Sequence, residues 1–103
     1  MIHVVASIEV VEGQLETFLA HFQHNRPFVL EEKGCLQYDP TVDHSLDLAV
    51  QDLSPSRVTV VERWESEEDL RAHFKAPHMD VYREKVKDLV AGVSLRVLKG
   101  TPG

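Results

Sequence analysis

Apolar and more polar residues alternate along the first strand-length stretch of the chain, with the apolar set at Ile2, Val4, Ala6, Ile8 and Val10. This period of two is typical of a strand with one face on a core. From Gly13 the apolar positions fall three or four residues apart, and this spacing continues until the Lys-Gly pair at 33–34. The change of period predicts a first helix that the glycine brings to an end.

Pro27 lies inside this predicted helix. A proline there removes one amide donor and clashes with the carbonyl of the preceding turn, so we expect a kink or a break near Asn25. Asn25 falls between Phe22 and Val29 on the apolar stripe, which would point its amide inward. The alternative is that Asn25 caps a helix that restarts with Pro27 in its first turn. The pattern leaves both possibilities open.

The second half of the chain repeats the order of elements. Residues 35–43 and 58–64 are predicted to be strands, separated by a long loop at 44–56. Ser66 is a predicted N-cap, because three acidic residues follow it in the first turn of a second helix. Pro77 begins a further helical segment that we expect to close at Gly92, before a last strand at 93–99. The inward stripe of that segment is Met79, Tyr82, Val86 and Leu89–Val90.

Strand, helix, strand, strand, helix, strand is the order of two split β-α-β units. It predicts an α+β, ferredoxin-like subunit with an antiparallel four-stranded sheet and both helices on one face. The other face carries apolar residues such as Val5, Val61 and Leu98 and needs a cover, which the sheet of a second copy would supply in a symmetric homodimer. We expect one domain over residues 1–103, with residues 100–103 flexible.

Charge and cysteine content exclude several classes of partner. Seventeen acidic residues against eleven Lys and Arg give a formal charge of -6, and the bases are scattered. Nucleic acid and anionic membranes are therefore not expected partners. The apolar N-terminus lacks a basic segment and is too short to span a bilayer, which favours a cytoplasmic protein. The single cysteine, Cys35, has no partner for an internal disulfide or a zinc motif.

The residues that suggest chemistry lie on the third predicted strand and the second helix. Glu62 and Trp64 share one strand face, and Leu70, His73 and Phe74 share one helix face. An inward carboxylate among valines is costly unless it is paired or functional. A semi-buried His73 would be suited to acid-base work near neutral pH.

Other kinds of chemistry find no support. His73 and His78 are not at the spacing of two metal ligands on one helix face, so we expect no metal site. An alternative for His78 is a hydrogen bond to backbone carbonyls nearby. No activated nucleophile or phosphate-binding loop is present, which argues against covalent hydrolysis and nucleotide chemistry. A small, mostly apolar pocket for a small aromatic ligand remains.

Three stretches, "VEGQLETFLAHF", "EEKGCLQY" and "VVERWESEEDLRAHFKAPHM", resemble the antibiotic biosynthesis monooxygenase family, which includes quinol monooxygenases. The similarity extends from about residue 2 to residue 98. It implies a dimeric α+β barrel and, in members that oxidise dihydroxy-aromatics, a reaction with dioxygen that uses no metal, flavin or other cofactor. The haem-degrading proteins of the superfamily resemble this chain less well. Ser7 stands where those proteins carry an asparagine on the first strand, and Arg83 stands near the position of their haem-ligating histidine.

The resemblance implies catalytic roles for Trp64, which matches the pocket tryptophan, and for Asn25, which matches a helix-one asparagine near the substrate oxygens. His73 and His78 match the two histidines that follow the tryptophan. Our hypothesis is a monooxygenase of a small quinol or polyketide-like aromatic, with His73 as general base and with Asn25 and Glu62 orienting oxygens. The remaining substrate-binding candidates are His78, Tyr82, Phe22, Phe74 and Tyr38.

Two alternatives stay open at this point. A cofactor-free isomerase of a small carbonyl substrate needs the same acid-base residues, and dioxygen consumption would separate it from a monooxygenase. A non-catalytic ligand-binding dimer would use the pocket histidines only to satisfy buried hydrogen bonds. In that case His73→Ala would lower stability or ligand affinity, with no turnover to lose.

Overall fold

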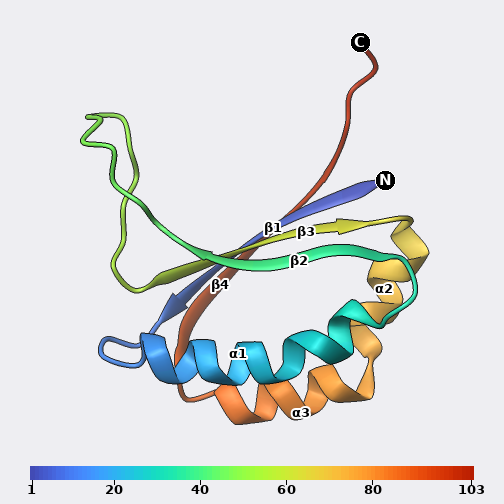
Figure 1. The fold of residues 1–103 in the computed structure, drawn as a ribbon, viewed down its shortest axis with the longest axis horizontal. Helices are drawn as coiled ribbons and strands as arrows, with labels where there is room; N and C mark the ends of the chain where they lie inside the picture. Colours follow the sequence, from blue (N-terminus) through green and yellow to red (C-terminus); the bar gives the residue numbers. More distant parts are fainter.

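The computed structural model describes residues 1–103 and has the predicted α+β architecture (Figure 1). Four strands form one antiparallel sheet in the order β2-β3-β1-β4, which is the ferredoxin-like arrangement. The elements are β1 (Ile2–Val10), α1 (Leu15–Leu30), β2 (Cys35–Val42), β3 (Arg57–Trp64), α2 (Glu67–Lys75), α3 (Pro77–Val86) and β4 (Val90–Lys99). The predicted fold class is confirmed, with the second helical region divided in two by Pro77.

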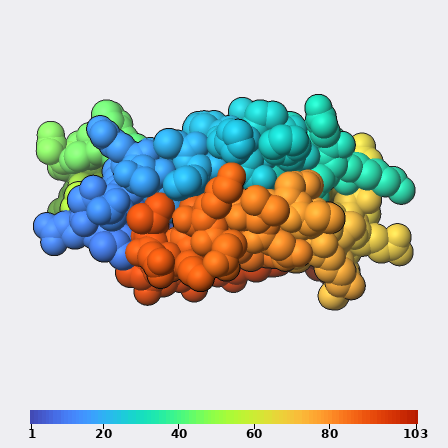
Figure 2. Space-filling view, turned by 90° about the horizontal axis from the view of Figure 1, so that it is seen from below, coloured from blue at the N-terminus to red at the C-terminus, as the bar shows by residue number.

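All three helices lie on one side of the sheet. Figure 1 shows α1 and α3 running beneath it, with α2 at one end. Figure 2, seen from that side, shows α1 and α3 next to each other across the middle of the molecule. Every second residue of β1 and β3 is buried beneath these helices, as the period of two predicted. The core therefore lies between the sheet and the helices.

The opposite face of the sheet has no helix over it. Val5 and Val61 are paired across β1 and β3 on this face, and both are partly buried. Leu98 of β4 is opposite His3 and points to the same side. The register therefore confirms the predicted placement of Val5, Val61 and Leu98 on the uncovered face.

The edge strand β4 leaves one wall of the core open. By register, Val93, Leu95 and Val97 lie opposite Ile8, Ala6 and Val4 and thus face the helix side. They are nevertheless 66%, 45% and 52% exposed. The helices cover β1, β2 and β3 but leave the inner face of β4 accessible along much of its length.

Pro27 does not interrupt α1, so the predicted break and the restarted helix are wrong. The proline lies in the last turn, where only one main-chain hydrogen bond inside the helix is lost. Phe22, Asn25 and Val29 are all buried on the same stripe, and their packing holds the helix together on both sides of the proline. The inward position of Asn25 is confirmed.

The ends of two helices also differ from the prediction. α1 ends at Leu30 rather than at the Lys-Gly pair, and α3 ends at Val86 rather than near Gly92. Val90 already pairs with Val10, so Gly92 lies inside β4. The β-branched and aliphatic residues of 90–97 gain more from pairing with the central strand β1 than from extending a helix.

The turn between α1 and β2 is tightly constrained. Gly34 has a φ of +79°, and a Cβ there would collide with the side chain of Asp69 at the start of α2. The Gly34 carbonyl accepts a hydrogen bond from the Glu65 amide at 2.9 Å, and the Glu32 carbonyl accepts one from the Cys35 amide at 3.2 Å. These contacts place Glu32 next to α2 and α3.

The loop between β2 and β3 extends beyond the sheet, away from the helices (Figure 1). Arg57 anchors its base by ion pairs to Asp43 at 2.6 Å and Asp52 at 3.1 Å. The 44–56 segment contributes no residue to either of the two main pockets of the subunit. None of the three helices combines the length and the apolar character needed to cross a bilayer.

Candidate active site

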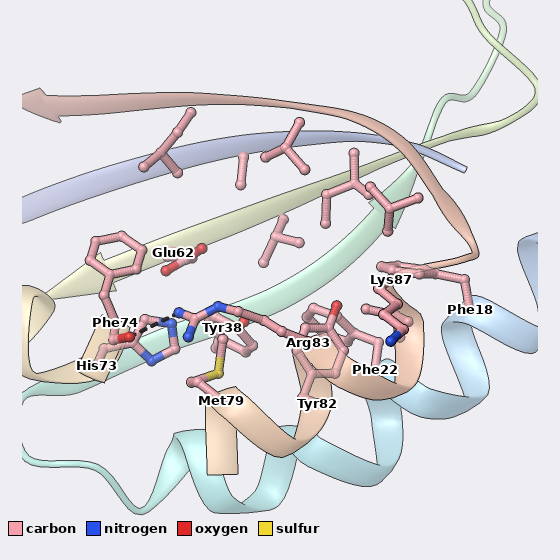
Figure 3. Close-up of a pocket in the computed structure, with 17 residues that line it drawn as sticks. Phe18, Phe22, Tyr38, Glu62, His73, Phe74, Met79, Tyr82, Arg83 and Lys87 are labelled. Atoms are coloured by element: carbon pink, nitrogen blue, oxygen red, sulfur yellow. Dashed lines mark hydrogen bonds between the residues drawn. The ribbon is translucent and has the colours of Figure 1, made fainter. Parts of the chain in front are cut away.

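A cavity of about 420 Å³ lies between the sheet and the helices. Thirteen of its seventeen lining residues are hydrophobic, which is typical of a site for a small, largely apolar ligand. Figure 3 shows His73, Glu62 and Phe74 at one end of the cavity and Phe18 and Lys87 at the other. The cavity is open beside β4, where Val93 and Leu95 are exposed.

His73 is buried at the polar end of the cavity, with only 2% of its surface exposed. Its ring lies 4.8 Å from that of Trp64 and 5.5 Å from that of Tyr38, measured between centroids. Burial lowers the pKa of His73, although the hydrogen bond to Glu32 acts in the opposite direction. His73 is therefore neutral near pH 7 and available to accept a proton.

The two ring nitrogens of His73 have different surroundings. Nδ1 donates to the Glu32 carboxylate, at 2.9 Å from Oε2 and 3.1 Å from Oε1. Nε2 makes no hydrogen bond within the chain. Every fully buried side-chain nitrogen or oxygen of the protein does have a partner, so Nε2 is not fully buried. Because His73 lines the cavity, Nε2 opens into it.

Glu62 is the second ionisable group at this end of the cavity. Burial raises its pKa to about 7, and the hydrogen bond from Trp64 Nε1 to Glu62 Oε1, at 3.0 Å, limits that rise. The other carboxylate oxygen makes no bond to protein atoms. A carboxyl group that titrates near neutral pH can both give and take a proton under ordinary conditions.

Two tyrosine hydroxyls line the same cavity without an intramolecular partner. Burial raises the pKa of both Tyr38 and Tyr82, so each hydroxyl keeps its proton and can donate a hydrogen bond to a ligand oxygen. Phe22 holds the two rings in place, stacked on Tyr38 at 5.2 Å and edge-on to Tyr82 at 6.1 Å between centroids.

Six of the nine residues singled out from the sequence line this cavity: Phe22, Tyr38, Glu62, His73, Phe74 and Tyr82. The other three do not. Trp64 lies behind Glu62 and His73 with none of its surface exposed. Asn25 faces a second, smaller groove between α1 and α3, and its amide reaches only Met79 Sδ, at 3.4 Å. His78 lines the same groove.

Glu32 is the residue that sequence reasoning missed. Its Oε2 accepts from His73 Nδ1 on one side and from His78 Nε2, at 2.8 Å, on the other. Its only sequence signal was its place in the last turn of the predicted helix, where a carboxylate opposes the helix dipole; this does not identify the two histidines as its partners. Arg83 was also missed as a lining residue; its Nη2 donates to the Phe74 carbonyl at 2.9 Å (Figure 3).

Trp64→Phe is expected to raise the pKa of Glu62 above about 7, because the indole hydrogen bond favours the ionised carboxylate and phenylalanine has no donor. A carbon-13 NMR titration of the glutamate carboxyl groups measures this, with Glu62→Gln identifying the resonance. An unchanged or lower pKa would show that the indole does not stabilise the carboxylate.

The fold and the site together define a class of protein. The model of the antibiotic biosynthesis monooxygenase family matches residues 1–85, and the chain belongs to this family.

Among its relatives is "Probable quinol monooxygenase YgiN" of Escherichia coli (strain K12), 37% identical over 101 residues, which are 96% of this chain and 97% of the relative. The solved structure of an antibiotic biosynthesis monooxygenase has a TM-score of 0.82 at 17% identity, covering 99% of this chain and 100% of that one. Protein SO0527 from Shewanella oneidensis has a TM-score of 0.78 at 28% identity, with coverages of 94% and 87%.

Proposed function

We propose that this protein oxidises a small aromatic quinol with dioxygen and needs neither a metal nor an organic cofactor. The observation that carries the proposal is the presence of His73 and Glu62, each with a polar atom that has no partner in the chain, at the same end of a largely apolar cavity. The free hydroxyls of Tyr38 and Tyr82 supply hydrogen bonds for the oxygens of the substrate. The name of the Escherichia coli relative supports a quinol as the substrate class.

The reaction begins with a proton transfer. His73 Nε2 takes the proton of the quinol hydroxyl, and the resulting phenolate gives one electron to dioxygen. The two radicals then combine, forming a carbon–oxygen bond at a ring carbon and leaving a peroxide anion. Glu62 is in its protonated form in part of the molecules near pH 7, and it transfers this proton to the peroxide.

The second half of the reaction restores both residues. The Glu62 carboxylate takes the hydrogen of the oxygenated ring carbon as a proton while the oxygen–oxygen bond breaks, which forms a carbonyl and releases hydroxide. Hydroxide takes the proton that His73 holds and leaves as water. Overall, a quinol and dioxygen give a hydroxyquinone and water, and both side chains return to their starting protonation states.

Dioxygen uptake by metal-free protein with a panel of reduced benzoquinols and naphthoquinols tests this proposal. We expect uptake above the autoxidation background and one water molecule formed for each oxygen molecule consumed. Uptake no faster than autoxidation across the panel would overturn the proposal and favour the isomerase or the ligand-binding protein.

The proposed assembly is a homodimer that buries the uncovered face of the sheet. Val5 and Val61 form a paired apolar centre on this face, with polar residues such as Thr59 and Arg63 around it. We expect sedimentation to give a dimer at micromolar concentration and Val61→Asp to give a monomer, because a carboxylate at the centre of the interface is desolvated without a partner. Thr59→Asp on the same strand is the matched variant nearer the edge. A wild-type monomer would contradict this assembly.

The proposed compartment is the cytoplasm. The apolar residues 2–10 form the central strand of the sheet, so they have a structural role within the domain. The single cysteine is consistent with a reducing environment, where disulfides are not a source of stability.

A further inference from the structure

Glu32 joins three segments that are distant in the sequence. It follows α1, and its carboxylate binds His73 of α2 and His78 of α3. The side chain of Glu32 is mostly buried, with 13% exposure. No arginine or lysine forms an ion pair with it; the two imidazoles are its side-chain partners.

A carboxylate in this position decides which nitrogen of His73 carries the proton. Because an ionised carboxylate only accepts hydrogen bonds, the neutral imidazole must place its hydrogen on Nδ1. Nε2 is then an unprotonated nitrogen whose lone pair faces the cavity. When Nε2 accepts the substrate proton, the imidazolium that forms is stabilised by the adjacent negative charge.

We propose that Glu32 is a positioning residue, which fixes the tautomer and the ring orientation of His73 so that Nε2 faces the cavity as a proton acceptor. His78 completes the arrangement from the groove between α1 and α3, where its Nε2–H holds the other side of Oε2. This role rests on the proposed function for its catalytic meaning. Glu32 does not line the cavity, so it acts on the substrate only through His73.

Nitrogen-15 NMR of the histidine side chains tests the positioning role without any substrate. In the wild-type protein at pH 8 we expect His73 to be protonated at Nδ1 and unprotonated at Nε2. Glu32→Gln places an amide donor beside Nδ1 and is expected to shift His73 toward the Nε2–H tautomer, as the general rule for such carboxylate–imidazole pairs predicts. Glu31→Gln, an exposed neighbour, is the matched control and leaves the tautomer unchanged.

Oxygen uptake provides the second readout. Glu32→Gln is expected to lower kcat by about tenfold to a hundredfold, the scale on which groups that orient a functional histidine act, with KM little changed. His78→Phe removes the donor to Glu32 and is expected to lower kcat in the same direction, whereas His78→Gln keeps an N–H donor and restores most of the rate.

The outcomes separate this inference from the proposed function. A wild-type His73 protonated at Nε2, or a tautomer that Glu32→Gln leaves unchanged, overturns the positioning role even if the protein consumes oxygen. Absence of wild-type oxygen uptake, together with a tautomer shift in Glu32→Gln, overturns the proposed function and leaves the positioning of His73 by Glu32 in place.

Discussion

Replacing His73 with glutamine is expected to lower the rate of quinol-dependent oxygen uptake by about a hundredfold or more, the usual contribution of a positioned general base. Glutamine retains a polar group that can bond to Glu32, but it has no nitrogen that accepts a proton near neutral pH. The background reaction of the quinol with dioxygen remains, so the loss is measured as the enzyme-dependent part of the rate in an oxygen electrode.

His44→Gln is the control for this substitution. His44 is exposed on the loop between β2 and β3, which lines neither pocket. Thermal unfolding of both variants shows whether the buried substitution has altered the fold. If the folded His73→Gln protein keeps the wild-type rate, His73 is not the base, and Glu62 becomes the next candidate, because one of its carboxylate oxygens is free and its pKa lies near 7.

Replacing Glu62 with glutamine is expected to stabilise the protein at pH 8 by about 3 kcal/mol, because a pKa difference of one corresponds to about 1.4 kcal/mol. The pKa of this carboxyl is about 7 in the folded protein, against 4.5 for an unperturbed glutamate side chain. Between these values the folded state binds more protons than the unfolded state, so the free energy of unfolding of the wild type falls as pH rises. The destabilisation of the wild-type protein by the buried Glu62 carboxylate is absent below about pH 4.5 and complete above about pH 7.

Denaturant unfolding at pH 5 and pH 8 measures this effect. The advantage of Glu62→Gln over the wild type is expected to be small at pH 5 and largest at pH 8, since glutamine still accepts the indole hydrogen bond but carries no charge. Glu65→Gln, an exposed glutamate on the same segment, serves as the control and gives no such difference between the two pH values. An equal effect at both pH values would mean that Glu62 is not held in a desolvated state.

The gain in stability is expected to accompany a loss of oxygen uptake, because glutamine cannot transfer a proton to the peroxide. A more stable but less active variant is the usual result when a buried charge is kept for function. In the wild type, the rate of oxygen uptake is expected to fall as the pH rises through about 7, because Glu62 loses its proton there. This fall is expected to be absent from any residual activity of Glu62→Gln.

The order of elements and the inward faces of β1 and β3 were predictable because they follow from local periodicity. Alternating valines define the strand face, so the inward position of Glu62 and Trp64 could be predicted from that alternation. The helix ends were less predictable. Strand pairing of Val90 with Val10 decided where α3 stops, and buried packing around Val29 carried α1 past Pro27.

The candidate site was predictable only in part. Periodicity tells which face a residue occupies, but it does not tell which side chain of another element lies between it and a cavity. Met79, from a segment far along the chain, separates Asn25 from the main cavity. Glu32 lies in a turn whose shape depends on tertiary contacts of Gly34 with Asp69 and Glu65, and no local pattern contains that information.

The two ends of the cavity differ in a way that bears on how substrate range changes. His73 and Glu62 lie at one end of the cavity and Phe18 at the other (Figure 3). Val93 and Leu95 line its opening beside β4, and none of these three apolar residues forms a hydrogen bond with His73 or Glu62. Substitutions of these apolar residues change the volume offered to a ligand while His73 and Glu62 keep their hydrogen-bond partners. Related chains, and laboratory variants of this one, are therefore expected to diversify in ligand preference by changing one region while retaining the same chemistry in the other.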